Sequence, residues 1–150
     1  MTGSQTPTGG GEAMPRITGL LETALYVDDM DRAVAFYETV LGLKVMSRSD
    51  RLTAFDAGRQ GVLLIFTRGA TREDVSVPGG TIPGHDGSGP LHMAFAIPED
   101  SLDAWRRRLA VCGVPIHSEM AWEQGGRSLY FHDPDGHVIE LATPGLWPTY

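Results

Sequence analysis

The sequence has 150 residues, of which 41% are hydrophobic and 21% charged, and this balance is typical of a folded domain rather than a disordered chain. Nineteen acidic against twelve basic residues give a formal net charge of −7, which disfavours a binder of nucleic-acid backbones. The apolar runs are too short to span a bilayer, the first fifteen residues lack the features of a secretory signal, and a single cysteine excludes a disulfide framework. We therefore expect a cytoplasmic protein with a small-molecule partner and with neither a nucleic-acid nor a membrane partner.

Composition divides the chain into five segments. Residues 1–15 are rich in Thr, Gly, Ser and Pro and predict a disordered tail. Residues 69–89 combine many glycines with prolines and little periodicity, and a loop of this length favours a lid or a linker. The intervening segments 16–68 and 90–145 are predicted to be folded modules, and residues 146–150 a C-terminal tail.

The two predicted modules repeat one another. Residues 21–27 match residues 91–97 at an offset of 70, and the local signals that follow recur in the same order. Near the ends of the modules, residues 61–65 match residues 136–140. Each module reads as a strand, a helix and three strands. We therefore predict an α+β fold in which two βαβββ modules form a cupped mixed sheet with the helices on its outer face.

Helical spacing of apolar residues places one helix in each module. Asp28 or Asp29 can cap the first helix by accepting a hydrogen bond from a free amide of its first turn, and Asp100 or Ser101 can cap the second. A glycine follows each helix, where a residue of left-handed conformation commonly ends one.

Alternation along the strands places candidate metal ligands on the face that points away from the helices. On the first strand of each module, this face carries Glu22, Ala24, Tyr26, His92, Ala94 and Ala96. The repeat superposes Glu22 on His92, and in the last strands it superposes Ile65 on Glu140. Buried carboxylates are costly unless they have a partner or a cation. We therefore predict that Glu22, His92 and Glu140 hold one divalent metal ion.

Oxygen and nitrogen ligands of this kind suit Fe, Mn, Ni, Co or Zn, and the sequence does not choose among them. Such an ion would polarise a carbonyl or enolate oxygen, or hold dioxygen beside a chelated substrate. The alternatives are that Glu22 lies at an exposed sheet edge and that His92 is a pocket histidine without a metal. The other histidines are expected at the surface: His85, His117, His132 and His137.

Three stretches of the sequence carry a family resemblance. They are residues 25–43, 89–95 and 129–141, the last with an Asp-Pro-Asp-Gly turn. These stretches resemble the vicinal-oxygen-chelate superfamily of glyoxalases, bleomycin-resistance proteins and extradiol dioxygenases, and the resemblance covers residues 17–145. It implies paired βαβββ modules, a divalent metal in the cup and a homodimer. It also places the metal ligands of the family on Glu22, His92 and Glu140.

The chain departs from the family pattern at three positions. Glu22 stands where histidine or glutamine is common, and Ile65 stands where glyoxalases have a glutamate as a fourth ligand. The extradiol signature has a catalytic histidine where residues 121–124 read Ala-Trp-Glu-Gln, which leaves Glu123 as a substitute base. Tyr130 matches the tyrosine of that signature, which implies that it donates a hydrogen bond to a substrate oxygen.

Together these observations favour a divalent-metal-dependent enzyme of glyoxalase or dioxygenase type that acts on a small, metal-chelating, oxygenated substrate. The residues expected to line its pocket are Ala24, Tyr26, Ile65, Ala94, Ala96 and Tyr130. The alternative is a non-catalytic protein of the bleomycin-resistance type that binds a small molecule, which the acidic charge also permits. The sequence leaves open whether one chain or two chains close the cup, and whether the reaction is that of a lyase, an isomerase or a dioxygenase.

Overall fold

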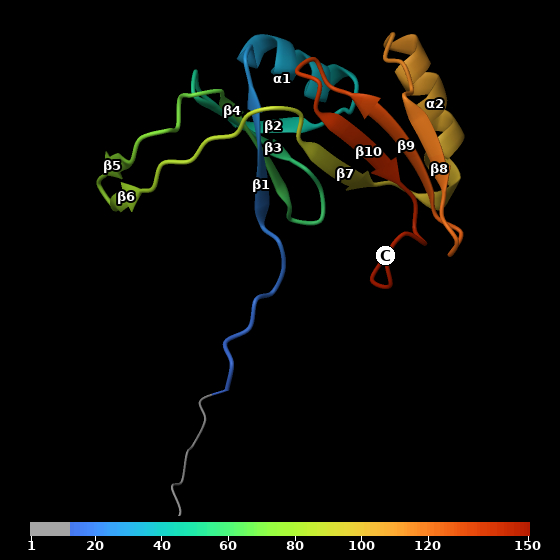
Figure 1. The fold of residues 1–150 in the computed structure, drawn as a ribbon, viewed down its shortest axis with the longest axis horizontal. Coiled ribbons are helices and arrows are strands. Elements are labelled where there is room, and N and C mark those ends of the chain that lie inside the picture. The colour runs from blue at the N-terminus through green and yellow to red at the C-terminus, as the bar shows by residue number, and fades with distance from the viewer. Residues whose placement is uncertain (1–12) are drawn as a thin grey trace, which may run out of the picture.

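The computed structural model describes residues 13–150, which fold into two βαβββ modules (Figure 1). The first module consists of β1 (Glu22–Val27), α1 (Met30–Thr39), β2 (Lys44–Arg48), β3 (Leu52–Asp56) and β4 (Val62–Thr67). The second consists of β7 (His92–Ala96), α2 (Leu102–Val111), β8 (Ser118–Ala121), β9 (Arg127–His132) and β10 (Val138–Ala142). The predicted α+β fold with two repeated modules is confirmed.

Each module forms a mixed four-stranded sheet with the same strand order. The orders are β1-β4-β3-β2 and β7-β10-β9-β8. The first strand of each module pairs in parallel with the last, and the remaining pairs are antiparallel. The helix supplies the crossover that a parallel pair requires. As a result, β1 and β7 are edge strands of their sheets.

The strand register corrects the sequence alignment of the two modules by one residue. Glu22 and His92 are equivalent, as predicted, because each begins the parallel pairing of its sheet. By the same pairing, however, the counterpart of Glu140 is Leu64 and not Ile65. A shift of one residue moves a side chain to the other face of a sheet. Ile65 is therefore fully buried in the hydrophobic core. It does not line the open face, which is the face of each sheet that points away from the helices.

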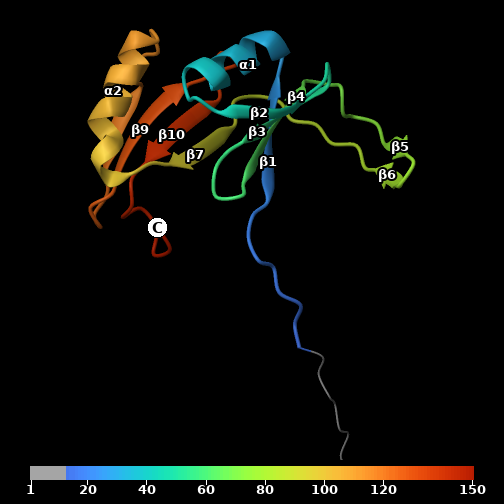
Figure 2. The ribbon, with the colours of Figure 1, turned by 180° about the vertical axis from the view of Figure 1, so that it is seen from behind.

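One hydrophobic core joins the helices to both sheets. The rings of Phe36 on α1 and Phe131 on β9 lie with centroids 6.4 Å apart, so the first helix packs against the second module as well as its own. Figure 2 shows both helices on the side of the sheets opposite to the open face. No helix among residues 13–150 combines the length and the apolar composition needed to cross a membrane.

The two helices begin differently. Asp29, one of the two residues predicted to cap α1, does so. Its side chain accepts a hydrogen bond from the Arg32 backbone amide at 3.0 Å. At α2 the capping prediction is wrong. A 3₁₀ turn (Glu99–Ser101) leads into the helix, and the Ser101 hydroxyl donates instead to the carbonyl of Pro98. Both modules still end their helices with a glycine at positive φ, which a residue without a side chain adopts readily.

The predicted loop between the modules contains a hairpin of β5 (Val75–Val77) and β6 (Gly80–Ile82), which projects from the body in Figure 1. Its base is fastened by reciprocal hydrogen bonds, because the His85 amide donates to the Thr71 carbonyl at 2.7 Å and the Thr71 hydroxyl donates to the His85 carbonyl at 2.5 Å. The Arg72 side chain adds an ion pair with Asp86.

The ends of the chain differ from each other. Of the predicted disordered tail, residues 1–12 lie outside the described residues, and residues 13–15 are exposed without regular secondary structure. The C-terminal segment folds back onto the second module, where the Tyr150 hydroxyl donates to the carbonyls of Ile97 and Ala142 at 3.0 and 2.9 Å. Tyr150 is thus tied to the second module, whereas residues 147–149 of the predicted tail are exposed.

Candidate metal centre

The open face of the second sheet brings His92 and Glu140 together. They stand on neighbouring strands, and His92 Nε2 lies 3.4 Å from Glu140 Oε2. The carboxylate is shielded, with 5% of its side chain exposed, whereas 54% of the His92 side chain is accessible. Two groups of the kind that bind divalent metals thus converge at a point that a small molecule can reach.

The hydrogen bond of the other ring nitrogen defines the protonation of His92. Nδ1 lies 3.0 Å from the carbonyl oxygen of Val138, which can only accept, so Nδ1 carries a proton. In the neutral ring, Nε2 then presents a lone pair to the Glu140 carboxylate. Between a neutral ring and an ionised carboxylate this contact is repulsive, unless a cation lies at the site or one of the two facing atoms carries a proton. The pair therefore fits a bound metal ion, with bonds near 2 Å, or an imidazolium–carboxylate ion pair.

A chain of hydrogen bonds orients the carboxylate. The Ser128 hydroxyl donates to Glu140 Oε1 at 2.5 Å, and the Trp122 indole N–H donates to the Ser128 hydroxyl at 2.8 Å. Outer hydrogen bonds of this kind fix the direction of a metal ligand. Neither Ser128 nor Trp122 was among the predicted site residues. Strand alternation is the signal that could have found Ser128, because it lies two residues before Tyr130 on β9.

Tyr130 stands directly opposite Glu140 in the antiparallel pair of β9 and β10, and its ring centroid lies 6.3 Å from that of His92. Burial raises the pKa of Tyr130, and the neighbouring Glu140 carboxylate raises it further. The hydroxyl therefore keeps its proton at neutral pH and is available as a hydrogen-bond donor beside the pair.

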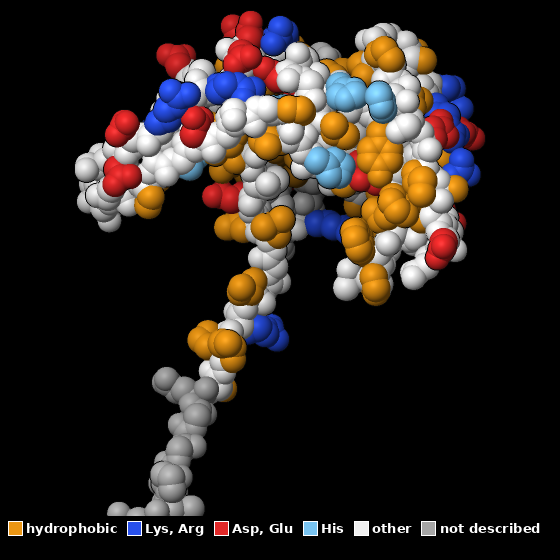
Figure 3. All heavy atoms as spheres, viewed as in Figure 1, with side chains coloured by type: hydrophobic (Ala, Val, Ile, Leu, Met, Phe, Trp, Pro, Cys, Tyr) orange, Lys and Arg blue, Asp and Glu red, His pale blue; other side chains and the backbone are white. Residues whose placement is uncertain are grey.

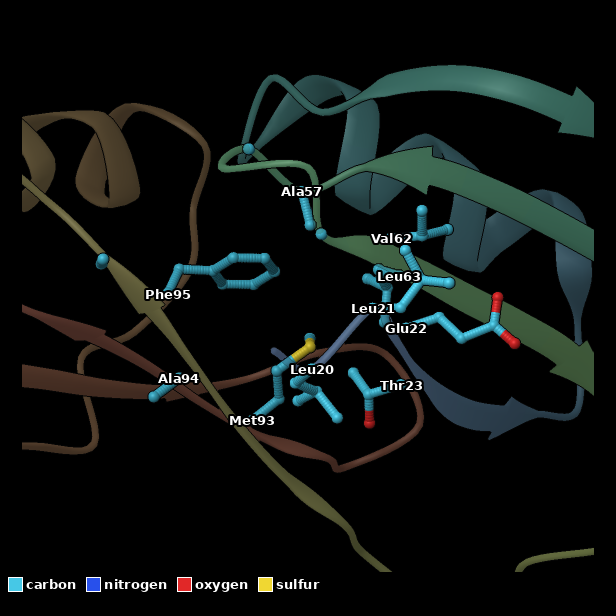
Figure 4. A pocket seen from close by; sticks show the side chains of 13 residues that line it. Leu20, Leu21, Glu22, Thr23, Ala57, Val62, Leu63, Met93, Ala94 and Phe95 are labelled. Atoms are coloured by element: carbon cyan, nitrogen blue, oxygen red, sulfur yellow. The ribbon is translucent and has the colours of Figure 1, made fainter. Parts of the chain in front are cut away.

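Glu22 lies on the other sheet, at the start of β1, and is exposed. It lines a cavity of about 160 Å³ between β1, β4 and β7 whose other lining residues are mostly apolar. In Figure 4 the Glu22 side chain leads away from Met93 and Phe95 of β7. Within residues 13–150, no three His, Cys, Asp or Glu side chains are close enough to share a metal ion. One chain thus brings together two of the three predicted ligands.

The open face of the first module is closed at one end by an aromatic cluster. The Tyr26 hydroxyl and His85 Nδ1 are hydrogen-bonded at 2.7 Å, and Phe66 stacks on Tyr26 and meets the His85 ring edge-on. His85 is half-buried here rather than solvated, so the surface prediction for it is wrong. Burial, followed by the charge of Asp86, raises the pKa of Tyr26. Ala24 lies between this cluster and Glu22 along β1.

The remaining predicted site residues surround the pair less closely. Ala94 and Ala96 are exposed on β7 and leave open space beside His92. Glu123 lies in the turn between β8 and β9, and within the described part of the chain it has no hydrogen bond or ion pair with His92 or Glu140. Figure 3 shows histidine side chains at the surface of this view. His117 and His132 are exposed, and their ring centroids lie 5.0 Å apart.

The Asp-Pro-Asp-Gly turn does not face the pair but joins the two modules. Asp133 accepts a hydrogen bond from the Tyr37 hydroxyl at 2.8 Å, and Asp135 accepts one from the Asp28 backbone amide at 2.9 Å. His137, which follows the turn, is fully buried, so its predicted surface position is wrong. The turn signal was recognised correctly in the sequence, but its docking against the first module is a tertiary contact that the local pattern does not contain.

Comparisons with known proteins agree with this architecture. Residues 19–141 match the family model of the Glyoxalase/Bleomycin resistance protein/Dioxygenase superfamily. The chain belongs to this superfamily. Among its curated relatives, a metallothiol transferase FosB of Bacillus licheniformis is 30% identical over 88% of this chain and 79% of the relative. A glutathione transferase FosA of Serratia marcescens is 29% identical over 87% of this chain and 84% of the relative.

Among solved structures, a lactoylglutathione lyase from Agrobacterium tumefaciens superposes with a TM-score of 0.81. The lyase is 31% identical to the present chain, and the match covers 89% of this chain and 99% of the lyase. The fold similarity therefore extends over both modules of the chain.

Proposed function

We propose that this superfamily member is a divalent-metal-dependent enzyme for a small oxygenated substrate that chelates the ion through neighbouring oxygens. The observation that supports this proposal is the 3.4 Å approach of His92 Nε2 to the shielded Glu140 carboxylate. Val138 fixes the ring so that its free lone pair points at that carboxylate. Nitrogen and oxygen donors in this arrangement suit Fe, Mn, Ni, Co or Zn.

The third ligand in this proposal is Glu22 of a second copy of the chain. Glu22 begins an edge strand and is exposed, as are the neighbouring apolar side chains of Leu20 and Leu21. A two-fold axis that brings β1 of one copy to the open face of the other would give two equal sites, each with ligands from both chains. This arrangement accounts for an exposed carboxylate beside apolar residues that a solitary chain leaves in water.

The protein side chains have separate tasks at such a site. When bound, the ion would supply electrostatic stabilisation of negative charge on a substrate oxygen. Tyr130 donates a hydrogen bond to the substrate and keeps its proton at neutral pH. Ser128 and Trp122 hold the carboxylate of Glu140 in place. We assign no base role to Glu123, because within residues 13–150 its side chain has no hydrogen bond or ion pair with His92 or Glu140.

The names of the relatives indicate which substrates to test first. A metallothiol transferase, a glutathione transferase and a lactoylglutathione lyase share the use of a thiol compound in their names. A catechol-2,3-dioxygenase of Bacillus subtilis is 30% identical over 78% of this chain but only 38% of its own length, and its name covers the dioxygenase alternative. We therefore propose that a thiol-containing substrate or cosubstrate is used, with dioxygenase chemistry on catechols as the second class to test.

Titration of the metal-free protein with Co²⁺, followed by its visible absorption spectrum, tests the first step. We expect one ion per chain in the wild type, loss of binding in His92→Ala and Glu140→Ala, and unchanged binding in the matched control His132→Ala. A fosfomycin resistance protein FosX from Listeria monocytogenes also superposes on this chain, with 25% identity and a TM-score of 0.63. A panel of lactoylglutathione, fosfomycin with glutathione, and catechol then tests the reaction class. A wild-type protein that binds a small molecule tightly but no ion would overturn the enzyme proposal in favour of a non-catalytic binding protein.

A further inference from the structure

His92 occupies a position where the backbone is expected to fray. It is the first residue of β7, which is an edge strand that pairs only with β10 in its sheet. It follows Gly89, whose φ is +73°, and Pro90, which has no amide hydrogen to donate. Strand ends open locally at low free-energy cost. A metal ligand placed here needs support from outside the ladder of its own strand.

Three hydrogen bonds fasten the start of β7 to the start of β10. The Val138 amide donates to the Leu91 carbonyl at 2.8 Å, and His92 Nδ1 donates to the Val138 carbonyl at 3.0 Å. In the third bond, the Leu91 amide donates to Nδ1 of the His137 side chain at 2.9 Å. The residue before the candidate ligand is therefore held at both its amide and its carbonyl.

The same contacts fix the tautomer of His137. The Leu91 amide can only donate, so Nδ1 accepts, and Nε2 carries the proton and donates to the Tyr26 carbonyl at 2.7 Å. The ring is fully buried, and both of its nitrogens have a partner. One neutral imidazole thus connects the start of β7 in the second module to the end of β1 in the first.

We propose that His137 is a positioning residue for the metal centre. Through Leu91 it holds the backbone that carries His92, and its bond to Tyr26 ties the ring to β1 of the first module without holding His92 directly. The inference rests on the proposed function of His92 as a metal ligand. The Tyr37 hydroxyl and Asp133 join the same two modules by a hydrogen bond of 2.8 Å, and Asp133 bonds the backbone of His137 but not its ring.

Two substitutions separate the two bonds of His137. In His137→Asn, the side-chain oxygen takes the place of Nδ1 and retains the acceptor for Leu91, but the side chain is too short to reach Tyr26. In His137→Gln, the amide nitrogen reaches the place of Nε2 and retains the donor to Tyr26, but the acceptor for Leu91 is lost. Tyr37→Phe is the matched control, because it removes a buried hydrogen bond of the same joint and keeps both bonds of the His137 ring.

The experiment combines Co²⁺ titration with thermal unfolding of the metal-free protein. We expect the unfolding temperature to fall in all three variants, because each loses one buried hydrogen bond. Cobalt affinity should fall by about tenfold or more in His137→Gln, as for lost outer partners of other metal ligands, and stay near the wild-type value in His137→Asn and Tyr37→Phe. Wild-type affinity in His137→Gln, or an equal loss in Tyr37→Phe, would overturn the proposal.

A readout on the metal-free protein separates this inference from the proposed function. Nitrogen-15 NMR of the histidine rings reports whether His92 keeps its Nδ1-protonated form. We expect that form in the wild type and in His137→Asn, and averaging between tautomers in His137→Gln. If the wild type binds no cobalt, the proposed function fails, and the NMR comparison still decides the positioning role. An unaltered His92 signal in His137→Gln would refute that role.

Discussion

The two modules have the same strand order and the same crossover, yet their open faces carry different chemistry. The second module brings His92, Glu140 and Tyr130 together over two adjacent strand pairs. At the equivalent positions of the first module, Glu22 replaces the histidine and Leu64 replaces the carboxylate. Only one module therefore has a convergent pair of metal-binding groups, while the other offers an isolated carboxylate and an apolar wall.

This difference shows that two modules of the same fold can contribute different residues to one site. The core faces of both modules contain alternating apolar residues, since each has to pack a helix on a sheet. The open faces are not bound by this requirement, so their residues can diverge without loss of the fold. A site built from one polar face and one mostly apolar face needs the two faces to meet, so substitutions on either face should affect it differently.

The largest effect on stability is expected from a comparison of two single substitutions, which place a carboxylate at either of two neighbouring positions in β4 of the first module. Ile65→Glu puts a charge into the core without a partner, which should cost more than about 4 kcal/mol and prevent folding. Leu64→Glu instead places the carboxylate on the open face, at the counterpart of Glu140, and should leave a folded protein. Circular dichroism and thermal unfolding check this contrast, and a stable Ile65→Glu protein would show the register to be wrong.

The register also marks the limit of what the sequence predicts. The order of elements, the cap at Asp29 and the equivalence of Glu22 with His92 follow from local signals that each residue carries with it. The alignment of the last strands failed by one residue because Val, Leu and Ile occupy both faces of β4, so alternation gave no polar marker to fix its phase. The surface predictions for His137 and His85 failed for another reason. The burial of both rings depends on contacts between segments that are distant in the sequence.

The next largest effect, on cobalt affinity, is expected when the carboxylate charge of Glu140 is removed from the second module. In Glu140→Gln the amide keeps the Ser128 contact but no longer neutralises a cation, so cobalt affinity should fall by at least about a hundredfold, or some 3 kcal/mol. The metal-free protein should not lose stability, because a buried charge is removed along with its desolvation cost. Isothermal titration and thermal unfolding measure the two quantities, and an equal fall in both would favour a purely structural ion pair.

Mixing two defective chains tests whether the apolar module of one copy serves the polar module of another. Glu22→Gln should weaken cobalt binding by about tenfold with stability unchanged, because the side chain is exposed. A mixture of Glu22→Gln and His92→Ala chains should regain full-affinity binding at one site in each mixed dimer. Each chain supplies the ligand that the other lacks. If no high-affinity sites return in a mixture of proven dimers, the two faces do not meet between chains.

The smallest effect is expected at Tyr130, where the second module contacts substrate rather than metal. Tyr130→Phe removes one hydrogen bond and should weaken substrate binding by about 1 kcal/mol, or roughly fivefold, without changing cobalt affinity. Because burial and Glu140 raise the pKa of Tyr130 above 10.0, its proton remains in place across the neutral range and leaves only at higher pH. The wild-type and variant pH profiles of substrate binding should therefore run parallel from pH 6 to 9, and a difference that opens within this range would mean that the tyrosine ionises there.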